Sequence, residues 1–136
     1  MSVQLRQSFF QVFTMSLLWV AALLTVFYGG QTVTIGYLWN VTGIAAIFAA
    51  LFGVMYTALW NHFTLKPVWN IFISSLLSIG GALLAVRLFS AEMYEMLLPW
   101  LPGMILLSLV LHTLGFYVYA GMDSRKKAEE LNASLK

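Results

Sequence analysis

The sequence predicts an all-α integral membrane protein with a bundle of four transmembrane helices, and three observations support this. Residues 7–65 contain no Asp, Glu, Lys or Arg. Over the whole chain 61% of residues are hydrophobic and 9% are charged, whereas an average globular protein has roughly 25% charged residues. The 136 residues leave room for about four spans of roughly 20 residues each and for little else. A soluble domain must present polar side chains to water, so the predicted solvent of this chain is lipid.

Turn-forming residues and charges divide the chain into four apolar segments. The first segment is closed by Gly29-Gly30 and is longer than the roughly 7–15 apolar residues of a signal peptide, so we expect it to be retained as a span. The third segment begins at Pro67, where the missing amide would have no helical partner. The serine and the two glutamates of residues 90–95 mark the turn that follows it. All four segments are continuously apolar, which favours helices over a β-barrel. The predicted spans are residues 9–28, 36–60, 67–88 and 97–121, and together they form a membrane domain of residues 1–121.

The placement of basic residues predicts that both chain ends are cytoplasmic, because Lys and Arg accumulate in cytoplasmic loops. Only Arg87 lies on the predicted outer side, where Glu92 and Glu95 are close enough in sequence to form an ion pair with it. The predicted inner side holds the other basic residues, namely Arg6, Lys66, Arg125, Lys126, Lys127 and Lys136. The chain is therefore predicted to cross its membrane several times, with both ends on the cytoplasmic side.

Residues 122–136 are the longest polar stretch of the chain. Within them Lys126 and Glu130 are four residues apart, a spacing that suits a helix, while Ala128, Leu131 and Leu135 would share one helical face. Two interpretations remain open: a short amphipathic cytoplasmic helix, or a frayed tail that holds anionic headgroups with its basic residues.

Small residues are grouped in the second and third predicted spans. In lipid, such residues allow helices to approach closely. One seam is Ala49 with Gly53, and a second is Ser74 with Ser78 and Ala82. These seams serve either packing within the chain or the docking of a second copy or a partner membrane protein.

His112 is the most unusual residue of the fourth predicted span, with Ser108 one helical turn before it. An ionisable group at membrane depth is a functional candidate. The alternatives are a neutral histidine bonded to a polar side chain of another span, or a ligand or proton-relay role. A haem held by His62 and His112 is disfavoured, because His112 would lie roughly 12 Å deeper in the membrane than His62. We expect no cofactor and no metal site.

Enzymatic activity is not expected. The chain has no cysteine, and no carboxylate lies near His112 in predicted depth to complete a hydrolytic triad. No predicted span contains an acidic residue, whereas ion-coupled carriers commonly keep one within the membrane. A channel formed by several copies remains open, and a nucleic-acid partner is not expected.

In three features the chain resembles a family of small four-span membrane proteins from Gram-positive bacteria, whose genes lie beside those of LytTR-type DNA-binding regulators. These features are the Phe48-Ala-Ala-Leu-Phe-Gly53 run, the turn at residues 60–67, and the chain end from Lys127 to Lys136. The resemblance implies a location in a bacterial cell membrane, crossed several times. It also implies an accessory protein that restrains or informs a cytoplasmic regulator, and it implies no catalytic residues.

The leading functional prediction is therefore a non-enzymatic regulatory or accessory subunit that binds a protein partner. The alternative is a homo-oligomeric channel or small-molecule carrier that uses His112 and the small-residue seams. The predicted partner-binding face consists of Lys66, Arg125, Lys126, Lys127, Leu131 and Leu135.

Overall fold

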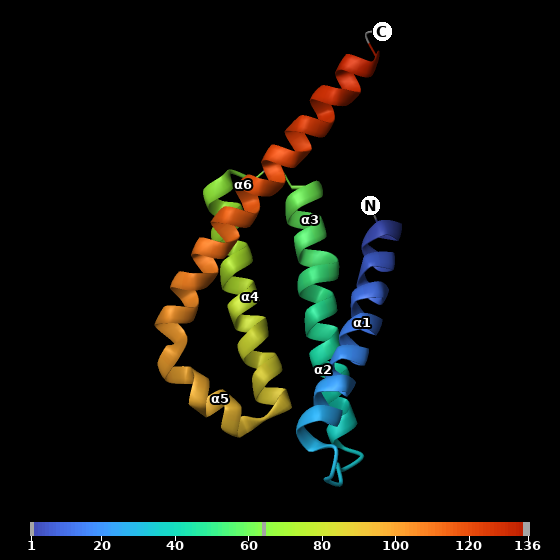
Figure 1. Cartoon of the computed structure of the whole chain (residues 1–136), viewed down its shortest axis with the longest axis vertical. Helices are drawn as coiled ribbons and strands as arrows, with labels where there is room; N and C mark the ends of the chain where they lie inside the picture. Colours follow the sequence, from blue (N-terminus) through green and yellow to red (C-terminus); the bar gives the residue numbers. More distant parts are fainter. Residues whose placement is uncertain (1, 64, 135–136) are drawn as a thin grey trace.

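The computed structural model describes residues 2–63 and 65–134. Within these ranges the chain is helical apart from short turns. Four helices are long and apolar enough to cross a membrane, as the sequence predicts. They run in alternating directions, so the N-terminus and the last turns of the chain lie toward the same end of the molecule (Figure 1).

The first helix, α1 (Ser2–Tyr28), begins seven residues earlier than the predicted span. No glycine or proline interrupts residues 2–28, so the helix continues into its polar N-terminal turns. At about 1.5 Å per residue it is roughly 40 Å long, and it therefore exceeds the roughly 30 Å hydrocarbon core of a bilayer. It ends at Gly29-Gly30, where the Gln31 amide bonds to the Tyr28 carbonyl at 2.8 Å.

The second predicted span is not a uniform α-helix. It consists of α2 (Tyr37–Phe48), a π-helical segment η1 (Ala49–Met55) and α3 (Tyr56–Asn61). The Tyr56 amide bonds back to the Leu51 carbonyl, five residues earlier. The wider turn shifts α3 relative to α2 by about one residue, which corresponds to roughly 100° of rotation about the helix axis. Residues on α3 therefore face a different neighbour from the one that a regular helix predicts.

The third span is α4 (Pro67–Phe89), close to its predicted range of 67–88. The turn predicted around residues 90–95 is instead a short helix, α5 (Ala91–Leu97), which continues through a 3₁₀ turn, η2 (Leu98–Trp100). The Ser90 hydroxyl caps α5 by accepting a hydrogen bond from the Met93 amide at 3.2 Å. The charges of Glu92 and Glu95 thus lie on a helix that joins α4 to α6.

The last helix, α6 (Leu101–Ser134), is 34 residues long. It continues without a break through residues 122–134, so the polar C-terminal stretch is helical as far as Ser134. Figure 1 shows this part of α6 projecting beyond the ends of the other helices.

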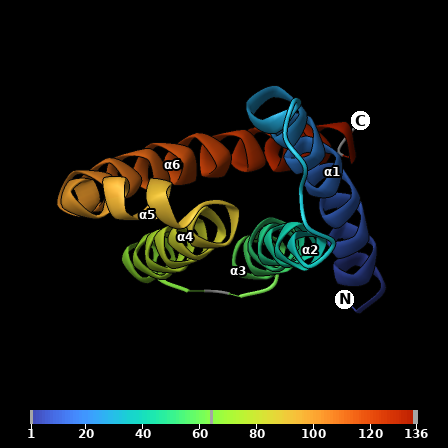
Figure 2. The same ribbon diagram turned by 90° about the horizontal axis from the view of Figure 1, so that it is seen from below.

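The four long helices form an open bundle (Figure 2). Helix α1 packs against α2 and η1, α2 packs against α4, and α4 packs against α6. Among the described residues, no extensive packing joins α1 to α4 or α6. The buried apolar cluster lies between α1, α2 and α4 and consists of Val20, Val41, Ile44 and Ala85. Between residues 101 and 122 the exposed side chains of α6 are mainly apolar, which suits contact with lipid.

At Gly53 the backbones of α1 and η1 approach each other closely. A Cβ atom on Gly53 would lie 2.9 Å from the Phe9 Cα atom and 2.9 Å from the Ser8 carbonyl oxygen. Ala49 is fully buried. The first small-residue seam therefore packs within the chain, where it allows two helix backbones to touch.

The second seam lies along α4. Ser74 is fully buried, and its hydroxyl donates to the side-chain oxygen of Asn70 at 3.3 Å. The amide nitrogen of Asn70 in turn donates to the Leu59 carbonyl at 3.2 Å. This carbonyl belongs to the last turn of α3, where a helix has no internal partner for it. Asn70 thus ties the end of α3 to the start of α4 across the turn between them.

Candidate functional site

A chain of hydrogen bonds at His112 connects α3, α4 and α6. The Nε2 atom of His112 (α6) is bonded to the hydroxyl of Tyr56 (α3). The same hydroxyl is 2.8 Å from the hydroxyl of Ser78 on α4. On the other side of the ring, Nδ1 lies 2.7 Å from the Ser108 carbonyl oxygen and 3.2 Å from the Ser108 hydroxyl. The structure therefore brings together His112 and Ser108, and it adds Tyr56 and Ser78 to them.

The directions of these bonds follow from the acceptor at one end. A carbonyl oxygen cannot donate, so we assign the proton to Nδ1 of His112. Nε2 then accepts from Tyr56, and Tyr56 accepts from Ser78. A protonated His112 would reverse both bonds, because Nε2 would donate to Tyr56 and Tyr56 would donate to Ser78. The hydrogen bonds from His112 to Ser78 can therefore point in either of two directions without any movement of heavy atoms.

Aromatic rings hold Tyr56 in place. Its ring stacks on Phe52, with centroids 5.5 Å apart and planes 6° apart, and it meets Trp60 edge-on at 5.7 Å. The Trp60 ring also contacts Phe116 and Tyr119 of α6, at 6.2 and 5.0 Å. These contacts fix α6 against α3 on the side of His112 that faces the C-terminal end of the chain.

His112 was predicted from the sequence as a candidate residue, whereas Tyr56 was not. The sequence did contain a signal for Tyr56, because a tyrosine within an apolar span must find a partner for its hydroxyl. The identity of that partner could not be deduced, since the π-helical turn of η1 sets the rotation of α3. Ser78 was predicted as a packing residue, and the structure shows that it is also a hydrogen-bond partner.

The predicted partner-binding face lies at the end of the molecule that holds the chain termini. Lys66 is exposed in the turn between α3 and α4, and residues 125–127 are exposed on α6. Leu131 is 66% exposed, and Leu135 lies outside the described residues. The Lys127 ammonium and the Asp123 carboxylate form an ion pair at 2.6 Å. The hydrogen bond and the negative charge of Asp123 raise the pKa of Lys127.

The outer ion pair predicted for Arg87 is not formed. The Arg87 guanidinium lies 5.2 Å from the centre of the Tyr94 ring, a cation–π distance. Within residues 2–63 and 65–134, the only salt bridge is that of Lys127 with Asp123. The prediction failed because residues 91–97 form a helix, which places Tyr94 rather than either glutamate over Arg87.

The two histidines do not form a shared site. His112 has both ring nitrogens engaged, while the Nε2 atom of His62 is buried and has no hydrogen-bond partner. In the part of the chain that the structure describes, no three His, Asp or Glu side chains are grouped as metal ligands would be. The arrangement around His112 can position or relay a proton, and it can join helices.

No protein-family model matches the chain, and no curated protein or solved structure is significantly similar to it.

Proposed function

We propose that the protein spans a bacterial cell membrane four times, with both chain ends in the cytoplasm. Four apolar helices of sufficient length support the insertion. The basic residues of the described chain, apart from Arg87, lie at the end of the molecule that holds the termini, which supports the orientation. The bacterial origin rests on the resemblance to the proteins encoded beside LytTR-type regulators.

Labelling of single cysteines tests this topology, because the natural chain has no cysteine. In intact cells a membrane-impermeant maleimide should label Glu92→Cys and should leave Ser134→Cys unlabelled. Permeabilised cells should show labelling of both variants. Labelling of Ser134→Cys from outside intact cells would contradict the proposed orientation.

We further propose that the protein is a non-enzymatic regulatory or accessory subunit that binds a protein partner through the end of α6. One observation carries this proposal: α6 continues past the other helices as an exposed helix that ends at Ser134. Its exposed basic residues and the exposed side chain of Leu131 give this helix both charge and an apolar anchor. Lys66 lies toward the same end of the molecule and would extend the surface.

Affinity capture from crosslinked membranes tests the partner. The variant with Glu at positions 125, 126 and 127 should lose its captured partners, and so should deletion of residues 123–136. The matched control exchanges Arg and Lys at the same three positions and keeps the charge, so it should retain them. The mass of the crosslinked product distinguishes another protein from a second copy of this chain.

Cysteine labelling of the charge-reversal variant must first show an unchanged topology, because the substitutions alter the bias of basic residues. An identical partner set in the wild type, the charge-reversal variant and the deletion would contradict the proposal.

The hydrogen-bond chain at His112 favours a second candidate, a proton-conducting channel or carrier built from several copies. The support is that the bonds among Ser78, Tyr56 and His112 can reverse direction when a proton arrives. Proton flux into liposomes tests this candidate. Flux that disappears in His112→Ala would favour transport, and absence of flux in the wild type would exclude it.

A further inference from the structure

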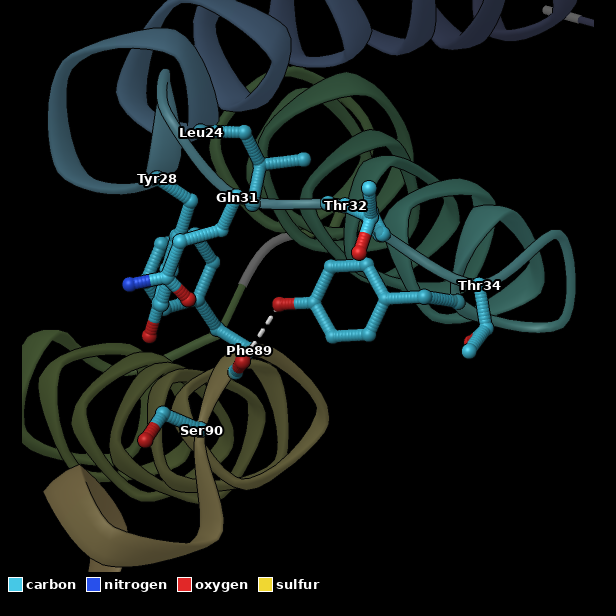
Figure 3. A pocket seen from close by; sticks show the side chains of 9 residues that line it. Leu24, Tyr28, Gln31, Thr32, Thr34, Phe89 and Ser90 are labelled. Atoms are coloured by element: carbon cyan, nitrogen blue, oxygen red, sulfur yellow. Dashed lines mark hydrogen bonds between the residues drawn. The ribbon is translucent and has the colours of Figure 1, made fainter.

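A small cleft, seen from close by in Figure 3, lies where α1 turns into α2 and α4 meets α5, at the end of the molecule opposite the chain termini (Figure 1). It has a volume of about 260 Å³. Its walls come from the end of α1, the turn between α1 and α2, the first residue of α2, and the junction of α4 with α5. The lining residues are Leu24, Tyr28, Gln31, Thr32, Val33, Thr34, Tyr37, Phe89 and Ser90.

Two contacts brace the walls of the cleft. The Tyr37 hydroxyl donates a hydrogen bond to the Phe89 carbonyl oxygen, which is drawn as a dashed line in Figure 3. This carbonyl is in the last turn of α4 and has no partner within its own helix. The rings of Tyr28 and Phe89 also pack together, with centroids 6.0 Å apart and planes tilted by 56°. The cleft is thus held between three helices and is not only a gap in a loop.

The lining offers unused hydrogen-bonding groups. Within the described part of the chain, the side chains of Gln31, Thr32 and Thr34 form no hydrogen bond to another residue. The Ser90 hydroxyl accepts from the Met93 amide and keeps its own proton available for donation. One amide and three hydroxyls can therefore both donate to and accept from a ligand.

The chemistry of the lining defines the ligand class. No Asp, Glu, Lys or Arg lines the cleft, and Arg87 is engaged with the ring of Tyr94. A charged ligand would lose part of its hydration without gaining a counter-charge, so the lining suits an uncharged ligand. The volume lies below the roughly 300–1,000 Å³ of sites for drug-sized molecules, so it suits a small one. Aromatic rings beside hydroxyl and amide groups suit a ring that has apolar faces and a rim of hydroxyls.

We propose that this cleft binds a single uncharged monosaccharide unit. Its C–H faces would pack against the aromatic walls formed by Tyr28 and Phe89, and its hydroxyls would bond to Gln31 and the neighbouring hydroxyls. The site is at the end of the molecule opposite the proposed partner-binding surface, and it is independent of that proposal.

Saturation-transfer NMR on the full chain tests the site. The protein is held in a zwitterionic detergent, because a glycoside detergent would itself supply sugar rings. The probes are glucose, galactose and N-acetylglucosamine, with glucuronate as the charged match for glucose. At least one neutral sugar should receive saturation, and binding of glucuronate should be about tenfold weaker or more, because its carboxylate must be desolvated.

Two substitutions place the binding in the cleft. Gln31→Ala removes the amide and Thr32→Trp fills the space, and each should weaken sugar binding by about tenfold or more. Both positions are exposed, so the helices should form in both variants, as circular dichroism can verify. The matched control is Gln4→Ala, an exposed glutamine near the other end of α1, and it should bind as the wild type does.

Three results would overturn the proposal. They are no binding of any of the three neutral sugars, binding of glucuronate equal to that of glucose, or sugar binding by Thr32→Trp that matches the wild type.

Discussion

Replacing Gly53 with alanine should destabilise the protein by about 1–3 kcal/mol, the range for overpacking in a close-packed interior. The new Cβ atom would lie 2.9 Å from the Phe9 Cα atom and 2.9 Å from the Ser8 carbonyl oxygen. Both are backbone atoms of α1, so they cannot move aside by a change of rotamer. The whole of α1 must shift away from η1, and the packing between these segments is lost. Reversible unfolding in mixed micelles, followed by circular dichroism, measures the change.

Two other glycines serve as matched controls. A Cβ atom on Gly80 would meet no atom within 4 Å, so Gly80→Ala should leave the stability unchanged or raise it by up to about 1 kcal/mol through helix propensity. A Cβ atom on Gly81 would meet the Cδ1 atom of Leu51, the end of a flexible side chain. The stability of Gly81→Ala should therefore lie between those of the Gly53 and Gly80 variants. Equal stability of the Gly53 and Gly80 variants would contradict the close approach of α1.

Replacing Tyr56 with phenylalanine should destabilise the protein by about 1–3 kcal/mol, because it leaves two polar partners unsatisfied. The hydroxyl of Tyr56 bonds to both His112 and Ser78. Measured hydrogen bonds between membrane helices average only about 0.6 kcal/mol each. A loss of stability near the lower limit of about 1 kcal/mol would therefore still agree with two broken bonds. The aromatic stacking on Phe52 is retained in this variant, and the change therefore reports on the hydroxyl alone.

Tyr117→Phe is the control for this substitution. Tyr117 is on the same helix as His112 and is 63% exposed, so removing its hydroxyl should change the stability by less than about 0.5 kcal/mol. A double-mutant cycle between Tyr56→Phe and His112→Leu should give a coupling energy of at least about 0.5 kcal/mol. If the two substitutions change the free energy of unfolding in a strictly additive way, this would contradict the hydrogen bond between Tyr56 and His112.

The long helices were predictable because their boundaries have strong local signals. Gly29-Gly30 ends α1, and Pro67 begins α4. The segment after Ser90 was predicted as a turn from its two glutamates. Charged residues are compatible with a helix, however, and residues 91–97 contain no glycine or proline. A serine followed by a helix-compatible stretch is an N-cap signal, and the structure follows that signal.

The candidate site was less predictable, for a reason specific to the second span. A π-helical turn shifts every later residue around the helix axis, and it leaves no mark in a segment that is apolar on all sides. The sequence indicated that His112 needs a polar partner. Its pairing with Tyr56 depends on the rotation of α3 and on the tilt of α6, and neither is encoded in a local pattern of residues.

The unbroken course of α6 has a mechanical consequence. His112 and Lys127 are on the same helix, with fifteen residue steps, or roughly 22 Å, between them. A force on the exposed C-terminal end of α6 would tilt this helix about its packing contact with α4. The hydrogen bond between His112 and Tyr56 attaches α6 to α3, so a force on the exposed end of α6 would act on a bond that lies well inside the bundle.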